Sequence, residues 1–193
     1  MLIFGYGSLV NVEHLQAYLG RTLVANQDFM LCRLQDYCRC WTAAMDNRIN
    51  LPGYKFYVEK HSGNRPQGVV TFLNIRPCSG KTITGIVFDV SEQELQRLDL
   101  RERNYRKVDV SDMIDSPTSR SIYAYVGRKE SDQRYQQGLE QKSAIISRDY
   151  YDLVYGAYKA LGAEALADYM DTTDPPQIPI VDLEKCPVTS TQE

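Results

Sequence analysis

Short apolar segments alternate with polar, glycine- and proline-rich turns along most of the chain. Several of these segments are rich in valine, isoleucine, threonine and phenylalanine, which is typical of strands. They predict strands over residues 2–5, 22–42 (as one or two strands), 68–75, 83–90, 105–110 and 121–126. The proline-containing stretch 77–80 is expected to end the strand before it. The turn-rich stretch 46–60 contains one further short apolar piece, 54–58.

Apolar residues at helical spacing predict helices elsewhere. The predicted helices cover residues 9–18, 92–100, 147–161 and 163–170. The second begins with a capping box, in which Ser91 and Glu94 would each bond the other's backbone N–H group. The third ends at Gly162 and contains Gly156, where we expect another element to pack closely, because interior glycine costs about 1 kcal/mol relative to alanine. Strands and helices do not alternate regularly, so the pattern predicts an α+β fold or a barrel with attached helices.

The composition changes near the C-terminus and divides the chain into two parts. Residues 1–170 predict a single domain, because 193 residues are enough for one core of ordinary size. Residues 171–193 contain four prolines and end in a polar run. We expect them to form an extended tail that lies on its own domain or on a neighbour, with disorder as the alternative.

Charge and composition restrict the partners of the protein. The net charge of -3 gives no bulk positive field, which argues against a nucleic-acid partner. No apolar run approaches the roughly 20 residues of a membrane span, and the N-terminus does not resemble a signal peptide, so we expect a cytoplasmic location. The five cysteines are expected to be reduced, with Cys38 and Cys40 packed beside a core Trp41. No metal or cofactor motif is found, and the oligomeric state is not specified.

The most informative motif follows the first predicted strand and reads Phe-Gly-Tyr-Gly-Ser-Leu over residues 4–9. A strand, a glycine-rich turn and a helix start direct several backbone N–H groups to one point, which suits an anion or an oxyanion. Ser8 could cap the helix or bond the same ligand, and glycine permits a positive φ or a close approach. Val10 replaces the third glycine of a dinucleotide fingerprint, and no P-loop lysine follows. An ordinary strand-to-helix turn is the alternative.

Glu102 is the candidate catalytic residue. It lies between a predicted helix and a predicted strand, with Arg101, Arg103 and Arg106 around it. A carboxylate within hydrogen-bond reach of a substrate proton can act as a general base. Opposite a loop that holds an oxyanion, it would complete a minimal site. The alternative is a solvated turn with surface salt bridges.

Taken together, these residues resemble the γ-glutamylcyclotransferase-like family. Residues 4–9 resemble its signature loop in the form carried by the ChaC branch, and 98–106 resembles the segment with the catalytic glutamate. Residues 147–162 are similar to the late helix of the fold, and the resemblance covers about residues 1–165. It implies a small mixed-strand β-barrel flanked by helices, and the branches that the sequence resembles are ChaC and AIG2-like.

The resemblance also implies an activity, the release of 5-oxoproline from a small-molecule γ-glutamyl substrate. Glu102 would be the general base, and Tyr6, Gly7, Ser8 and Leu9 would bind the substrate. The α-amine of the glutamyl unit would attack its own γ-carbonyl, so the site mainly has to fold the substrate. No cofactor or metal is implied, and glutathione, γ-glutamyl amino acids and γ-glutamyl amines all stay open. The alternatives are a non-catalytic binding protein of the same fold and a biosynthetic enzyme that removes a γ-glutamyl group.

A tyrosine could assist the reaction, but the sequence does not identify it. Asp149 falls where the family's late helix often has a tyrosine, with Tyr150 and Tyr151 directly after it. Tyr123 and Tyr125 are further candidates, although alternating tyrosines in a strand usually serve packing.

Overall fold

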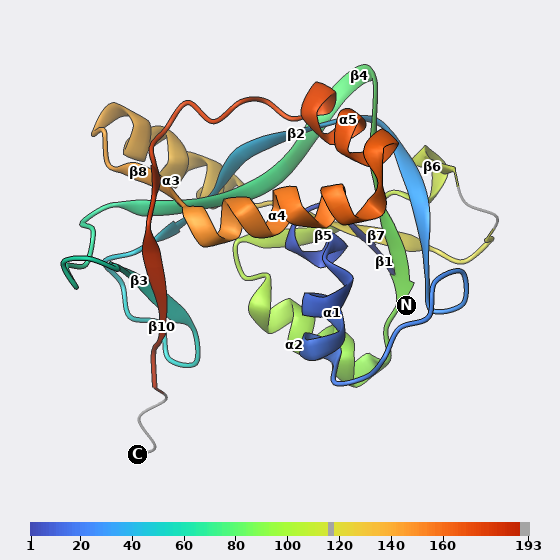
Figure 1. The fold of residues 1–193 in the computed structure, drawn as a ribbon, viewed down its shortest axis with the longest axis horizontal. Coiled ribbons are helices and arrows are strands. Elements are labelled where there is room, and N and C mark those ends of the chain that lie inside the picture. The colour runs from blue at the N-terminus through green and yellow to red at the C-terminus, as the bar shows by residue number, and fades with distance from the viewer. Residues whose placement is uncertain (116–117, 190–193) are drawn as a thin grey trace.

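A curled sheet of mixed strands forms the centre of the fold (Figure 1). The computed structural model describes residues 1–115 and 118–189. The sheet contains β1 (Leu2–Gly5), β2 (Phe29–Asp46), β4 (Val69–Asp89), β5 (Tyr105–Asp109), β6 (Ile114–Asp115), β7 (Ile122–Gly127), β8 (Ala144–Ser147) and β9 (Ile180–Val181). Strand β1 is antiparallel to β4 and parallel to β7. The predicted α+β fold, with a small mixed-strand barrel flanked by helices, is confirmed, and the curled sheet forms a half-barrel.

The two longest strands, β2 and β4, pair antiparallel over most of their length. The prediction that 77–80 separates two strands was wrong, because β4 continues through this stretch. The register shifts there between Gln35 and Tyr37, and Gly80 adopts a φ of +76°. The Gly80 N–H group donates to Asp36 Oδ1 at 2.7 Å. The proline and glycine therefore produce a bulge and leave the strand intact.

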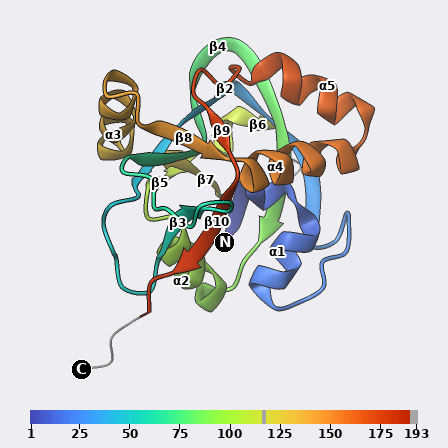
Figure 2. The same ribbon diagram turned by 60° about the vertical axis from the view of Figure 1, so that its left-hand side comes forward.

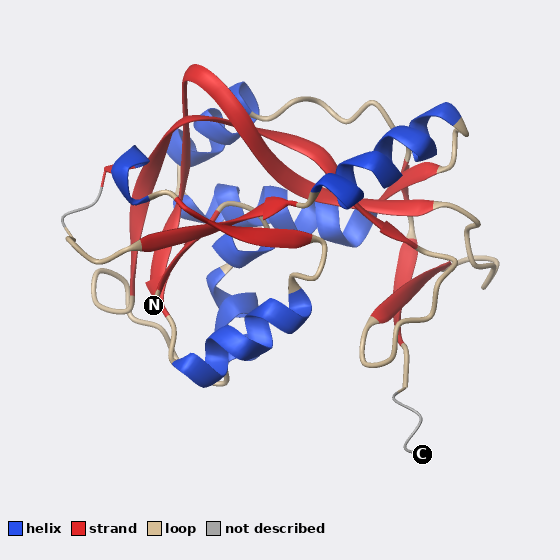
Figure 3. Ribbon diagram, turned by 180° about the vertical axis from the view of Figure 1, so that it is seen from behind, coloured by secondary structure: helices blue, strands red, loops and turns tan. Residues whose placement is uncertain are grey.

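Helices cover both faces of the sheet (Figure 3). They are α1 (Val12–Leu19), α2 (Glu92–Arg101), α3 (Lys129–Glu140), α4 (Arg148–Leu161) and α5 (Ala163–Thr172), with 3₁₀ turns at Ser8–Val10 and Ser111–Met113. Helices α2, α4 and α5 follow the predicted ranges closely. Helix α3 was missed because Tyr135 and Leu139 are the only large apolar residues in its sequence. The expectation for Gly156 was wrong, since a Cβ there would meet no atom within 4 Å. Within the described residues, no helix is long and apolar enough to cross a bilayer.

Two apolar clusters fill the two faces of the sheet, because successive strand side chains point to opposite sides. In β1, Phe4 belongs to one cluster and Ile3 to the other. The Phe4 cluster lies under α4 and α5, and the Ile3 cluster lies under α1 and α2. The helices on each face are therefore held by burial of apolar surface.

A fully buried arginine fixes α4 and α5 against β2. Arg39 is 0% exposed, and its guanidinium lies 4.7 Å from the ring centre of Tyr158 in α4. It donates to Thr172 Oγ1 at 2.6 Å and to the carbonyl of Thr84. These bonds offset the cost of removing the cation from water. Helix α4 is thereby anchored in its C-terminal half.

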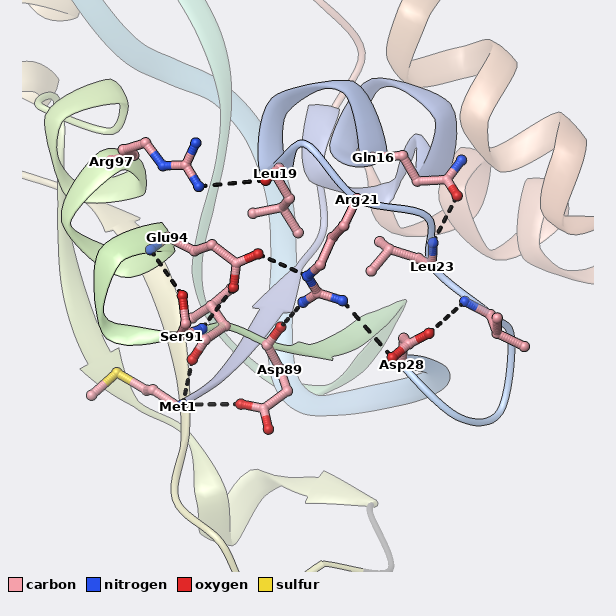
Figure 4. A network of polar contacts seen from close by, with 12 residues as sticks. Met1, Gln16, Leu19, Arg21, Leu23, Asp28, Asp89, Ser91, Glu94 and Arg97 are labelled. Carbon is pink, nitrogen blue, oxygen red and sulfur yellow. Dashed lines mark hydrogen bonds and ion pairs between the residues drawn. The ribbon is translucent and has the colours of Figure 1, made fainter.

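A polar network fixes the start of α2 (Figure 4). The Ser91–Glu94 capping box is confirmed, with both reciprocal hydrogen bonds present. Arg21 donates to Glu94 Oε1 and to the Asp89 carbonyl, each at 2.7 Å. The Met1 ammonium group contacts Asp89 Oδ1 at 3.0 Å. The network thus fixes the N-terminal end of α2, and the candidate base Glu102 follows directly after the C-terminal end of the same helix.

After α5 the chain returns across the molecule and adds two more strands. Strand β9 pairs in parallel with β8. Strand β10 (Leu183–Pro187) then pairs antiparallel with β3 (Lys55–Glu59) in a separate two-stranded ribbon. Figure 2 shows the path from β9 to β10 on the side that faces the viewer. The predicted tail is therefore paired with the rest of the fold through β9 and β10, although residues 190–193 lie outside the described range.

Candidate active site

A cavity of about 800 Å³ opens between the end of α2, the start of α4 and the β3–β10 ribbon. Helix α1 and the turn after β1 complete its wall. Its volume is within the ordinary range for small-molecule sites, and both polar and aromatic side chains line it. The cavity therefore suits a small polar ligand with an apolar part.

Glu102 and Ser8, distant in sequence, are joined in this cavity by one arginine. Glu102 caps the end of α2, where its N–H group donates to the Leu98 carbonyl at 2.8 Å. Its side chain is only 13% exposed, and Oε1 lies 3.2 Å from Arg101 Nε. Arg101 Nη2 donates to Ser8 Oγ at 2.8 Å. The candidate base and the signature loop thus share a site.

The other predicted binding residues do not present side chains to the cavity. Tyr6 is buried and donates its hydroxyl to the carbonyl of Tyr125, while Leu9 is 7% exposed in the core. Gly7 has a φ of -120°, so of the two reasons considered for a glycine here, a positive φ does not apply. Space is the constraint at Gly7, because a Cβ would lie 3.3 Å from the Tyr150 hydroxyl.

The loop does not lead directly into a long helix. Helix α1 begins at Val12, and its cap is Asn11, whose side chain accepts from the His14 N–H group at 2.8 Å. The expected helix start at residue 9 was therefore wrong, and of the two roles considered for Ser8, capping α1 does not apply. A 3₁₀ turn follows the loop, and N–H groups at the start of such a turn have no acceptor inside it. These N–H groups can donate hydrogen bonds to a ligand, but a turn this short adds no helix dipole.

Among the candidate tyrosines, Tyr150 lines the cavity. Tyr151 instead stacks on Trp41 in the core, with ring centres 5.3 Å apart. Tyr125 donates to Asp99 Oδ1 at 2.6 Å, and neither Tyr125 nor Tyr123 lines the cavity. Burial, followed by the charge of Glu102, raises the pKa of Tyr150 well above its ordinary value. Its hydroxyl therefore stays protonated and can donate a hydrogen bond.

Three further ionisable residues reach the cavity from segments without a sequence motif: His14, Lys55 and Lys185. Burial, followed by the charge of Arg101, lowers the pKa of His14 to about 4, so this imidazole is neutral at pH 7. Burial is also the main reason why the pKa of Lys55 falls to about 8. Only tertiary structure brings these side chains together, so sequence periodicity could not have identified them.

The cysteines contribute to packing and lie outside the cavity wall. Cys38 and Cys40 are buried, as is Trp41, in agreement with the expected core position. Burial raises the pKa of the Cys38 thiol to about 12 and that of Cys40 to about 11. Thiols of such high pKa are poor nucleophiles at neutral pH. No group of three or more histidine, cysteine or acidic residues able to hold a metal ion occurs in residues 1–115 and 118–189.

Comparison with protein families gives a match over most of the sequence. The model described as "Gamma-glutamyl cyclotransferase, AIG2-like" matches residues 3–152. The chain belongs to this family. The matched segment of this family member includes the signature loop, Glu102 and Tyr150, and it ends before β10. The predicted family resemblance is thereby confirmed.

Comparison with solved structures finds matches at low sequence identity, one of them with a TM-score above 0.5. An uncharacterized protein from Homo sapiens is 16% identical, with 91% of this chain and 89% of that chain covered and a TM-score of 0.51. A structure titled "Gamma-glutamyl cyclotransferase" is 14% identical over 91% of this chain and 89% of that one, with a TM-score of 0.48. A protein from Arabidopsis thaliana is 21% identical over 70% of this chain and 66% of that one, with a TM-score of 0.42. A search of curated proteins finds no match.

Proposed function

We propose that this family member is a γ-glutamylcyclotransferase that releases 5-oxoproline from a γ-glutamyl compound. The observation that carries the proposal is the Ser8–Arg101–Glu102 connection, which places a carboxylate and the signature loop in one cavity wall. A carboxylate and a set of hydrogen-bond donors are the two elements that intramolecular acyl transfer requires.

In the proposed reaction, Glu102 accepts a proton from the α-ammonium group of the glutamyl unit. The freed amine attacks the γ-carbonyl carbon, and the new C–N bond closes a five-membered ring. The bond to the leaving nitrogen then breaks, and Glu102 passes on the proton that it holds. The ring nitrogen loses two of its three protons in all, one before the attack and one after it, and both end on the leaving nitrogen, which departs as an ammonium ion. The products are 5-oxoproline and the free amine, and no water is consumed. Because the attack is intramolecular, holding the substrate in a folded conformation supplies much of the acceleration.

Donors around Glu102 would hold the anionic parts of the substrate. Arg101 Nη1 is buried and has no hydrogen-bond partner within the described residues. A buried guanidinium N–H without an acceptor is costly, and a substrate carboxylate would satisfy it. We assign Arg101 and Ser8 to the α-carboxylate of the glutamyl unit. The N–H groups that open the 3₁₀ turn, together with the Tyr150 hydroxyl, are the candidates for the developing oxyanion.

The proposal is tested by incubating the protein with glutathione, a γ-glutamyl amino acid and a γ-glutamyl amine, and measuring 5-oxoproline by mass spectrometry. We expect enzyme-dependent release from at least one of the three classes. A non-catalytic binding protein would bind one of them without forming 5-oxoproline. An enzyme that hydrolyses the γ-glutamyl bond would release glutamate.

A further inference from the structure

The β3–β10 ribbon carries two lysines on the face that it turns toward the cavity. Residues directly opposite each other in an antiparallel pair share a face, and Tyr57 lies opposite Lys185 while Lys55 lies opposite Pro187. All four of these residues line the cavity. Lys55 lies inside the segment matched by the family model, and Lys185 lies beyond it.

Lys55 has aromatic neighbours and no acidic partner. Its Nζ lies 4.4 Å from the ring centre of Phe72, 5.4 Å from that of Tyr54 and 5.8 Å from that of Tyr57. No ion pair of Lys55 or Lys185 is found within the described residues. Burial lowers the pKa of Lys55; the charge of Glu102 opposes this shift, and the charges of Arg101 and Lys185 add to it. A half-buried ammonium group in such surroundings would be stabilised by an anion.

The acidic groups of the cavity wall are already paired. Glu102 contacts Arg101, and Asp149 contacts Lys60 Nζ at 2.7 Å. The two lysines of the ribbon therefore form no ion pair within the described wall, although the charge of Glu102 acts on Lys55 from a longer distance. This side of the cavity therefore suits a negatively charged group of a ligand.

We propose that Lys55 and Lys185 bind a carboxylate on the leaving-amine part of the substrate. The chain would then act on γ-glutamyl amino acids or peptides in preference to γ-glutamyl amines. This inference rests on the proposed function, which places the α-carboxylate of the glutamyl unit at Arg101, close to Glu102. The second carboxylate, on the far side of the scissile bond, is then left for the ribbon.

The test compares two ligands that differ in one charge, γ-glutamylalanine and γ-glutamylalaninamide. Their affinities are measured calorimetrically on the Glu102→Gln protein, so that neither ligand is consumed. We expect the acid to bind about tenfold more tightly than the amide, as is reasonable for a charge-assisted contact. Lys55→Gln and Lys185→Gln, each added to that background, should weaken acid binding several-fold and leave amide binding unchanged.

Lys81→Gln is the matched control, since Lys81 pairs with Asp171 and does not line the cavity. It should leave both affinities unchanged. Lys185 is exposed, so its substitution tests the inference even if a change at Lys55 disturbs folding. Equal binding of the two ligands, equal loss of both in the lysine variants, or absence of binding would overturn the inference.

The outcome can be separated from that of the proposed function. Release of 5-oxoproline by the wild-type protein is measured with the same two compounds. A preference for acid binding without 5-oxoproline would leave the ribbon's role intact and refute the cyclotransferase activity. Equally efficient release from both compounds would support the activity and refute the role of the lysines.

Discussion

The two walls of the cavity differ in how they are built. One wall, called the α2 wall, is formed by the end of α2 with Arg101 and Glu102 and by Ser8 from the turn after β1. One hydrogen bond and one ion pair join these residues. The ribbon wall carries Lys55 and Lys185, which have no acidic partner among the described residues. We infer that the first wall performs chemistry common to the family and the second selects the substrate. The predictions that follow test this division of roles.

The largest effect is expected from Glu102→Gln. Glutamine keeps the shape of the side chain but cannot accept a proton, so kcat should fall by about 10²–10⁴. The circular dichroism spectrum should not change. Glu140→Gln, an exposed change at the end of α3, is the control and should retain full activity. Activity of Glu102→Gln within a few-fold of wild type would remove this residue from the mechanism.

Arg101→Gln should have the next largest effect on activity. The change removes a charged donor to Ser8 and the partner of Glu102, and hydrogen bonds to charged groups contribute about 1.5–3 kcal/mol. We expect a loss of roughly 10–100-fold in kcat/KM, measured by 5-oxoproline release. Arg106→Gln, at an exposed position of β5, should behave as wild type. Equal activity of the two variants would show that the Arg101 bridge is dispensable.

The attachment of the ribbon can be tested through Leu183, which is 1% exposed and pins β10 to the core. Leu183→Ala should lower the free energy of unfolding by about 2–3 kcal/mol, since it creates a cavity. In thermal unfolding this corresponds to a drop in Tm of roughly 5–10 °C. Glu184→Ala, on the exposed neighbour in the same strand, should change Tm little. If Leu183→Ala melts like wild type, β10 is not docked in solution.

The smallest effect is expected from the charge of Lys55. Its pKa in the folded protein is about 8, below the ordinary 10.5, so the unfolded chain binds more protons between these values. Wild-type stability should therefore rise with pH across this window. Lys55→Met should be more stable than wild type at pH 7 by about 1 kcal/mol, because the partly exposed side chain keeps some solvation.

Urea unfolding at pH 7 and at pH 10 measures this effect. Lys81→Met, at an exposed and paired lysine, should change the free energy of unfolding by less than about 0.5 kcal/mol at either pH. If the free energies of unfolding of Lys55→Met and wild type are equal at both pH values, burial of the Lys55 charge does not destabilise the free protein.

Sequence reasoning found the α2 wall but not the ribbon wall, for physical reasons. The loop after β1 and the Ser91 capping box are local signals, in which a few neighbouring residues determine the backbone. Lys55 and Lys185 gain their role from the pairing of β3 with β10, and no local pattern specifies contacts between such distant segments. The same limit explains why the stretch 77–80, which contains Gly80, was expected to end a strand. Its partner Asp36 lies on another strand.

The most direct test of the central claim is the product balance of the wild-type protein with its best γ-glutamyl substrate. Mass spectrometry should find 5-oxoproline and the free amine in equal amounts, with no glutamate above background, and Glu102→Gln should abolish both products. Glutamate in place of 5-oxoproline, or unchanged product formation by Glu102→Gln, would contradict intramolecular cyclisation driven by this carboxylate.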